Sequence, residues 1–148
     1  MTRSGRLGIV KQATAHNERE HAERVAAAER HVVEMEEKLG ALEQYRREYE
    51  AGFAHRASGG LGIGASRDYQ TFLARLTDAL EQQRVLVEQA RAAHQLSIAA
   101  WREAAKRAHV VDTLAVRWKV EETREESRRD QRDSDEISQQ RHTRERDS

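Results

Sequence analysis

Residues 58–66 read Ser-Gly-Gly-Leu-Gly-Ile-Gly-Ala-Ser, and this stretch decides the fold because it interrupts an otherwise continuous helical pattern. Its four glycines fall within six residues and remove helix propensity locally, while the rest of the chain has no proline to break a helix. One breaker between two helical segments predicts an antiparallel coiled-coil hairpin, centred near Leu61 and with Asp68 as the N-cap of helix two. We expect one all-α domain over 1–148, with helix one over about 7–53, a turn over 54–68, helix two over about 69–141 and a frayed tail over 142–148.

Apolar residues in the first segment recur at alternating spacings of three and four, which is the a/d pattern of a coiled coil. The seam positions are Val25, Ala28, Val32, Met35, Leu39, Leu42, Tyr49 and Phe53. Arg46 occupies one expected apolar position, and Tyr45 lies beside that gap. Nearer the N-terminus the same positions are polar: Lys11, Thr14, Glu18 and His21.

The second segment continues the pattern over a longer stretch, although several of its sites are small or polar. Its seam positions are Tyr69, Leu73, Leu76, Leu80, Gln83, Val87, Ala90, His94, Ser97, Trp101, Ala104, Ala108, Val111, Ala115 and Trp118. A turn centred near residue 61 places Phe53 beside Tyr69, Leu39 beside Gln83, and Val25 beside Ser97.

Composition narrows the class of function. Charged residues make up 35% of the chain, which is compatible with disorder, but the strict apolar periodicity favours a folded coiled coil. Lys and Arg number 26, as do Asp and Glu, so the basic surplus typical of nucleic-acid binding is missing. Without cysteine there is no disulfide, and no apolar run approaches a membrane span, so we expect a cytoplasmic protein that does not insert into the membrane.

No motif in the sequence predicts catalysis, a cofactor or a metal. The histidines lack the spacing of metal ligands: they are His16, His21, His31, His55, His94, His109 and His142. The glycine-rich stretch lacks the Gly-Lys-Ser/Thr ending of a phosphate-binding loop, and no strand precedes it. We therefore assign no catalytic residues and expect a protein-binding function.

Two features suggest binding surfaces. Beyond Trp118 the chain is almost entirely polar, and pairs such as Glu125 and Arg129 have the i,i+4 spacing of an exposed helix. Early in helix two, Phe72, Ala79 and Leu86 repeat every seven residues beside the seam. A two-stranded seam needs only the a and d positions. The extra row therefore either wraps over the seam near the turn or forms a ridge that docks another protein.

With these features in place, the sequence resembles the FliJ family of the bacterial flagellar type III export apparatus. The resemblance covers about residues 7–141. It rests on Leu42-Glu43-Gln44-Tyr45-Arg46-Arg47-Glu48-Tyr49, on Asp68-Tyr69-Gln70-Thr71-Phe72-Leu73, on Trp101-Arg102-Glu103, and on Arg129-Asp130-Gln131-Arg132-Asp133-Ser134-Asp135-Glu136. Two positions depart from the family's pattern: Gln83, where histidine is frequent, and Ala104-Ala105, where charged residues are common.

The resemblance implies a non-enzymatic stalk, similar to the shaft of rotary ATPases, at the inner-membrane side of the flagellar base. Its implied partners are the flagellar export ATPase hexamer, the cytoplasmic linker of the export-gate membrane protein and, for some members, export chaperones. The implied gate-binding residues are Phe72, Leu76, Ala79, Gln83, Leu42, Tyr45 and Tyr49. The candidate ATPase-binding residues are Arg124, Arg128, Arg129, Gln131, Arg132, Asp135 and Glu136.

Other functions remain open at this stage. The stalk of a virulence-type secretion system would have the same architecture, but the motifs quoted above favour the flagellar family. A structural scaffold would need apolar residues facing outward along most of both helices, whereas the surplus here is local. A metal- or nucleotide-dependent enzyme is the remaining alternative, and a hydrolysis assay on the isolated chain would reveal it.

Overall fold

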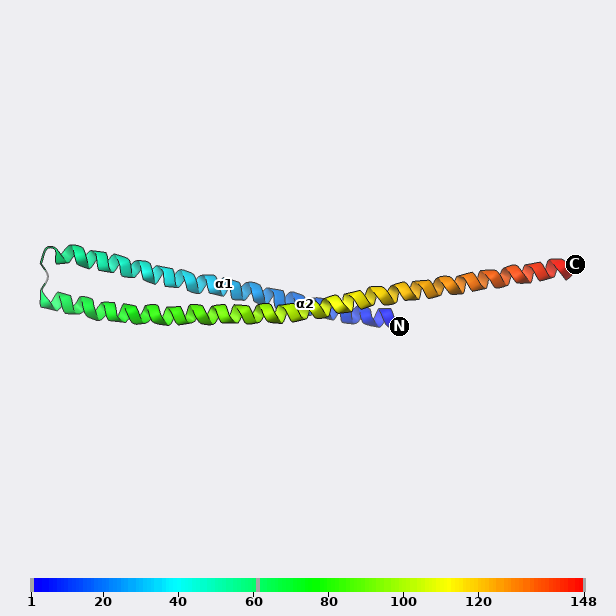
Figure 1. Cartoon of the computed structure of the whole chain (residues 1–148), viewed down its shortest axis with the longest axis horizontal. Coiled ribbons are helices and arrows are strands. Elements are labelled where there is room, and N and C mark those ends of the chain that lie inside the picture. The colour runs from blue at the N-terminus through cyan, green and yellow to red at the C-terminus, as the bar shows by residue number, and fades with distance from the viewer. Residues whose placement is uncertain (1, 61, 148) are drawn as a thin grey trace. The chain divides into compact units, whose positions relative to one another are not determined.

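The computed structural model describes residues 2–60 and 62–147, and these residues form two α-helices with no strand among them. Helix α1 covers Arg3–Ala57 and helix α2 covers Ile63–Asp147 (Figure 1). The predicted all-α, two-helix architecture is confirmed. Each helix is longer than predicted at both ends, since α1 begins four residues earlier than Leu7 and α2 remains helical through the tail predicted to fray.

The turn is shorter than expected because the backbone closes it within a few residues. The amides of Gly59 and Gly60 donate to the carbonyls of Arg56 and Ala57, each at 3.1 Å, which tightens the last turn of α1. Gly60 has a φ of 87°, a left-handed conformation that favours glycine. Leu61, the predicted centre of the turn, lies outside the described residues.

The predicted N-cap of helix two was wrong, because Asp68 lies inside α2. The helix begins five residues earlier, at Ile63, where the Ser66 amide donates to the Gly62 carbonyl at 3.2 Å. Glycine lowers helix propensity without forbidding helical geometry. The hydrogen bond from Ser66 therefore extends the helix back through Gly64.

The chain divides into two compact units, and each pairs one segment of α1 with one segment of α2. Unit 1 consists of Met1–Arg19 and Glu103–Ser148, and unit 2 is Glu20–Arg102. The expectation that 1–148 form a single domain stays a prediction.

In unit 2, α1 runs towards the turn and α2 runs back from it, so the two helices are antiparallel and lie side by side (Figure 1). The core consists of seam residues: Met35, Leu76, Leu80, Val87 and Ala90 are buried. Val32 and Leu39 pack against the group formed by Met35, Val87 and Ala90. Burial of apolar side chains along this line is what joins the two helices.

In unit 1, the helices are also antiparallel, because Arg3 pairs with Glu121 at 3.1 Å while Lys11 pairs with Asp112 at 2.8 Å. Ala104 is buried, and Val111, Ala115 and Trp118 are half-buried. The C-terminal part of α2, orange to red in Figure 1, continues past the first residues of α1. This unit therefore contains both a paired segment and an unpaired one.

Candidate functional site

All the tyrosines and phenylalanines of the chain gather beside the turn in unit 2. The Phe53 and Tyr69 rings stack with centroids 3.6 Å apart, which confirms their predicted neighbourhood. Tyr49 lies 5.3 Å from the Tyr69 ring and 4.3 Å from the Phe72 ring. Tyr45 completes the group by meeting Phe72 edge to face at 6.0 Å. We call these five residues the aromatic cluster.

Helical spacing explains how the cluster forms. Tyr45, Tyr49 and Phe53 are four residues apart and therefore lie on one face of α1, while Tyr69 and Phe72 are three apart on α2. Two of these pairs, Tyr45 with Phe72 and Tyr49 with Tyr69, have centroid separations within the favourable range for aromatic pairs, and such pairs add about 0.5–1.5 kcal/mol each beyond the area they bury. The cluster is thus a local reinforcement beside the glycine-rich turn.

The predicted gate-binding residues divide into buried and accessible members. Leu76 and Gln83 are buried in the seam between α1 and α2. Phe72, Ala79 and Leu42 are half-buried, as is Tyr49. Tyr45 is the most accessible, with 49% of its surface exposed. Ring contacts bring Tyr45, Tyr49 and Phe72 together, while Leu76 and Gln83 face the partner helix.

Gln83 has a structural partner that periodicity did not predict. Its side-chain Nε2 donates to the backbone carbonyl of Met35 at 3.0 Å and lies 3.6 Å from the Met35 sulfur. Leu39, the neighbour expected from the position of the turn, lies one helical turn from Met35 and packs on the core group around Val87. A buried amide needs a hydrogen bond, and the Met35 carbonyl supplies it.

The row Phe72, Ala79, Leu86 becomes more accessible with distance from the turn. Phe72 and Ala79 are half-buried, and Leu86 is exposed. Only the part of this row nearest the turn meets the aromatic cluster, where Phe72 contacts the accessible ring of Tyr45.

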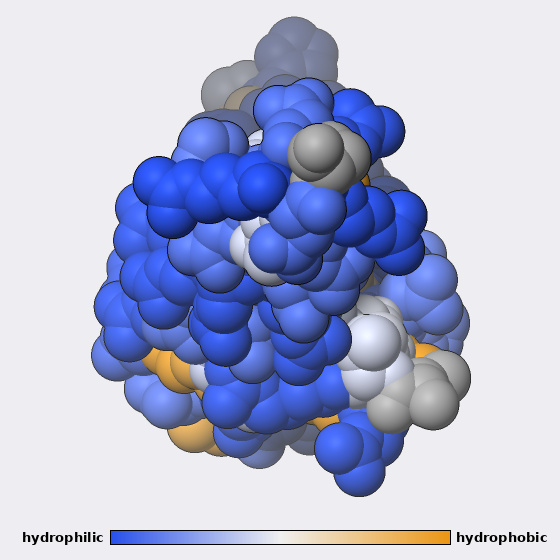
Figure 2. All heavy atoms as spheres, turned by 90° about the vertical axis from the view of Figure 1, so that its right-hand side faces the viewer, coloured by the Kyte–Doolittle hydropathy of each residue, from blue (hydrophilic) through white to orange (hydrophobic). Residues whose placement is uncertain are grey.

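The predicted ATPase-binding residues all lie in the exposed C-terminal part of α2. Residues 123–147 are exposed throughout, and the hydrogen bonds described between the two helices end at Ser4 and Glu122. Intrahelical contacts support the segment: Arg129 pairs with Glu125, and Gln131 donates to Asp135, both at 3.3 Å. Figure 2, viewed from the C-terminal side of α2, shows a largely hydrophilic face with small separate apolar spots.

The paired part of unit 1 ends in a polar clasp between the start of α1 and α2. The Ser4 amide donates to Glu122 Oε1 at 3.1 Å, and the Ser4 hydroxyl donates to Oε2 of the same carboxylate. These bonds hold the pKa of Glu122 below its ordinary value of 4.5, the hydroxyl contributing most. The Arg3 guanidinium lies 4.1 Å from the centre of the Trp118 ring. The carboxylate of Glu122 thus satisfies free amides at a helix N-terminus.

About two turns further along α1 from Ser4, Lys11 and Asp112 form an exposed ion pair. The hydrogen bond and charge of Lys11 lower the pKa of the Asp112 carboxyl from its ordinary 3.8. The sequence had placed Lys11 at a seam position, and its ammonium reaches the seam's edge to make this pair.

The side chains described in 2–60 and 62–147 include no group of three or more His, Cys, Asp or Glu placed to hold a metal. Over the same residues, neither helix has a stretch long and apolar enough to cross a bilayer. The geometry leaves two distinctive features accessible: the edge of the aromatic cluster at Tyr45, and the charged helix beyond Glu122.

Comparison with known proteins agrees with this geometry. The model of the family described as flagellar FliJ protein matches residues 3–147. A relative from Salmonella typhi, named flagellar FliJ protein, is 27% identical over 139 residues, covering 94% of this chain and 95% of that protein. No solved structure matches. Because the family match spans nearly every residue of both helices, the chain belongs to the flagellar FliJ protein family.

Proposed function

We propose that this protein is a stalk and coupling component of the bacterial flagellar type III export apparatus. It binds the export ATPase ring through α2 beyond Glu122 and the cytoplasmic linker of the export-gate membrane protein through the aromatic cluster and its neighbours. It acts by binding, not by catalysis, and is held at the inner membrane through its partners. The observation that carries this proposal is a 25-residue stretch of helix, 123–147, that is exposed throughout and polar except for Ile137, in a member of a family of flagellar proteins.

The proposed binding of the export ATPase is supported by the side-chain chemistry of residues 123–147. A helix exposed on all sides gains nothing from burial, so its persistence depends on local pairs such as Arg129 with Glu125. Guanidinium and carboxylate groups at its surface form hydrogen bonds that polar loops of a ring can match. The arrangement therefore suits a partner that surrounds or flanks the helix.

Truncation after Glu122 tests whether the exposed segment of α2 binds the ATPase. This end point keeps the contacts of Arg3 with Glu121 and of Ser4 with Glu122, so the paired part of unit 1 stays intact. We expect the truncated chain to lose stimulation of the ATPase, measured as phosphate release. A chain truncated after Arg141 is the control and should retain most of it. Full stimulation of the ATPase by the chain ending at Glu122 would contradict the proposal that the residues beyond it bind the ATPase.

The proposed binding of the export-gate protein is supported by the accessible edge of the aromatic cluster. Tyr45 is half exposed and contacts Phe72, which gives a rigid aromatic anchor of the kind found at binding hot spots. Phe72→Glu and Ala79→Glu change this edge while leaving the buried Leu76 in place. We expect both to weaken binding to the cytoplasmic part of the gate protein and to reduce motility.

The matched control for Phe72→Glu and Ala79→Glu is Leu96→Glu. It adds the same charge to α2 in unit 2, at a side chain that is 73% exposed. It should bind the gate protein normally. Helicity and thermal unfolding are measured for all three variants. Normal gate binding by folded Phe72→Glu and Ala79→Glu proteins would show that the cluster only wraps the seam.

A virulence-type secretion stalk is the alternative assignment, and it would use the same two surfaces. Deleting the gene in a flagellated host separates the two functions. Loss of motility with intact effector secretion supports the flagellar assignment.

A further inference from the structure

One flank of α2 in unit 1 carries a line of residues that changes from apolar to basic. They follow one another at spacings of three or four, which places them on one face of the helix. The line consists of Val110, Leu114, Arg117, Glu121, Arg124, Arg128 and Arg132. We call this line the α2 strip.

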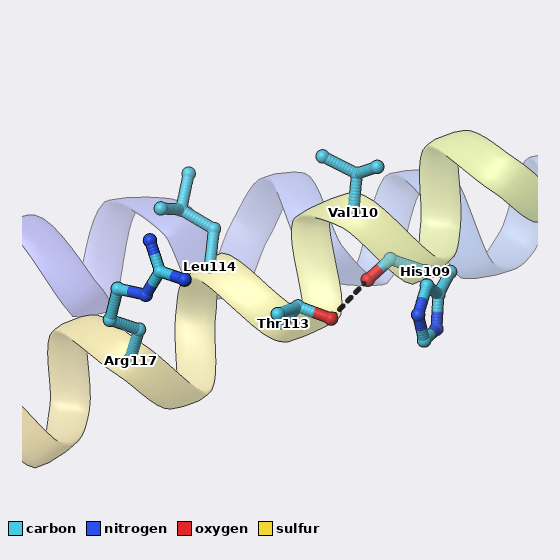
Figure 3. A pocket seen from close by; sticks show the side chains of 5 residues that line it. All are labelled: His109, Val110, Thr113, Leu114 and Arg117. Atoms are coloured by element: carbon cyan, nitrogen blue, oxygen red, sulfur yellow. Dashed lines mark hydrogen bonds between the residues drawn. The ribbon is translucent and has the colours of Figure 1, made fainter.

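The apolar end of the strip is an open hollow of about 330 Å³ lined by His109, Val110, Thr113, Leu114 and Arg117. Val110 and Leu114 point the same way, and His109 points away from them (Figure 3). Val110 is 64% exposed. The Thr113 hydroxyl donates to the His109 carbonyl at 2.9 Å, so this polar group is already satisfied. The hollow therefore offers apolar surface.

The basic end of the strip is a second open groove, lined by Glu121, Arg124, Glu125, Arg128 and Arg132. Both of its carboxylates already have partners: Glu121 pairs with Arg3 at 3.1 Å and Glu125 with Arg129 at 3.3 Å. The three arginines form no ion pair with any side chain in the part of the chain that is described. The groove thus presents three unneutralised guanidinium groups in a row.

The opposite face of the same helix has the opposite charge. Glu126, Asp130 and Asp133 follow at spacings of four and three, and at about 100° per residue they lie roughly half a turn away from the arginine row. These carboxylates also form no described ion pair. The segment is therefore two-faced, which gives a partner one preferred side.

We propose that the α2 strip is the docking surface for a polypeptide segment that carries an apolar side chain for the hollow and carboxylates for the arginine row. The strip runs roughly 33 Å from Val110 to Arg132. Bidentate pairing of guanidinium with carboxylate makes acidic side chains the matching chemistry. This inference rests on the proposed function, in that the export ATPase carries the segment, and it assigns the contact to one face of the helix.

Two charge-reversal variants of the full-length chain test the strip. R124E/R128E/R132E reverses the strip, and E126R/D130R/D133R reverses the opposite face with the same number of changes. Binding to the ATPase is measured at two salt concentrations, with helicity as the folding check. We expect the strip variant to bind about tenfold more weakly or worse, with a flatter salt dependence, and the opposite-face variant to bind within about twofold of the unchanged chain.

The apolar end is tested by Val110→Asp, with Val116→Asp as control, because Val116 is comparably exposed in unit 1 and lies off the strip. Weaker ATPase binding by the first variant alone supports the strip, and equal binding by both overturns its apolar end. Equal losses from the two charge-reversal variants overturn the strip but leave the proposed function standing, because the unchanged chain still binds. If the unchanged chain does not bind the ATPase, both proposals fail.

Discussion

Helix α2 differs sharply between its segment in unit 2 and its segment beyond Glu122. In unit 2 it buries Leu76, Leu80, Val87 and Ala90 against α1, while residues 123–147 bury nothing. The first segment takes its stability from apolar burial, and the second from pairs of its own side chains. The same helix thus combines a segment that joins the two helices with a C-terminal segment whose side chains are exposed to solvent.

The largest expected effect tests whether stability resides in the buried segment. Leu80 is only 1% exposed, so Leu80→Ala should lower the free energy of unfolding by about 2–5 kcal/mol. Leu96→Ala on the same helix removes a mostly exposed side chain and should change it by less than about 0.5 kcal/mol. Urea unfolding followed by circular dichroism measures both. Similar values for the two variants would contradict a seam-based stability.

The next effect concerns the buried amide in the apolar seam. In Gln83→Glu the Met35 carbonyl would face an acceptor, and the change should cost about 1–3 kcal/mol. In Gln83→Leu the Met35 carbonyl keeps its helical partner, so stability should change by less than about 1 kcal/mol.

Binding of the gate protein to the Gln83→Leu variant tests whether Gln83 contacts that partner or only stabilises the seam. Because Gln83 is buried against α1, the folded leucine variant should bind the gate protein as the unchanged chain does. If that variant loses binding while its unfolding transition is unaltered, Gln83 contacts the partner directly and the seam must open to expose it.

Periodicity was sufficient to predict which face of α2 packs against α1. Every predicted seam position of α2, from Tyr69 to Trp118, is buried or half-buried. The 3–4 spacing alone fixes that face, whatever the side chain, so even His94 and Ser97 were placed correctly.

Contacts that depend on polar geometry were not predictable from the sequence. The clasp of Ser4 with Glu122 needs the register of two distant segments to within one residue, and periodicity defines it only to about a turn. The same limit explains why the hydrogen bond from Gln83 to the Met35 carbonyl was not predicted. Helix ends were missed for a related reason: the backbone bonds at Gly60 and Ser66 set them, not a side-chain cap. Whether the predicted binding residues contact their partners stays a prediction.

Removing the exposed segment should have little effect on stability. Truncation after Glu122 leaves every described contact between α1 and α2 in place, so the free energy of unfolding should change by less than about 0.5 kcal/mol. The helical signal should fall in proportion to the 25 helical residues, 123–147, that are removed. A loss of stability above about 1 kcal/mol would mean that the segment folds back on the paired helices in solution.

The smallest expected effect is the pH dependence of the stability that the hydrogen bonds between Ser4 and Glu122 contribute. Since bonds from Ser4 lower the pKa of Glu122 in the folded state, the ionised carboxylate contributes stability above its unfolded pKa. This contribution is lost as the pH falls below about 4.5 and through the lower folded value. Asp112, lowered by Lys11, loses its contribution in the same direction below about 3.8.

Titration of the Glu122 carboxyl by carbon NMR separates the contribution of Glu122 to this pH dependence from that of Asp112. In Ser4→Ala the hydroxyl bond, which is the largest cause of the shift, disappears while the backbone amide remains. The pKa of Glu122 should therefore rise towards 4.5 without reaching it, and that of Asp112 should not move. Identical Glu122 titrations in the two proteins would show that the clasp is open in solution. The start of α1 would then be as free of its partner helix as residues 123–147 are, and the contrast between the paired and unpaired parts of unit 1 would begin earlier in α2 than Glu122.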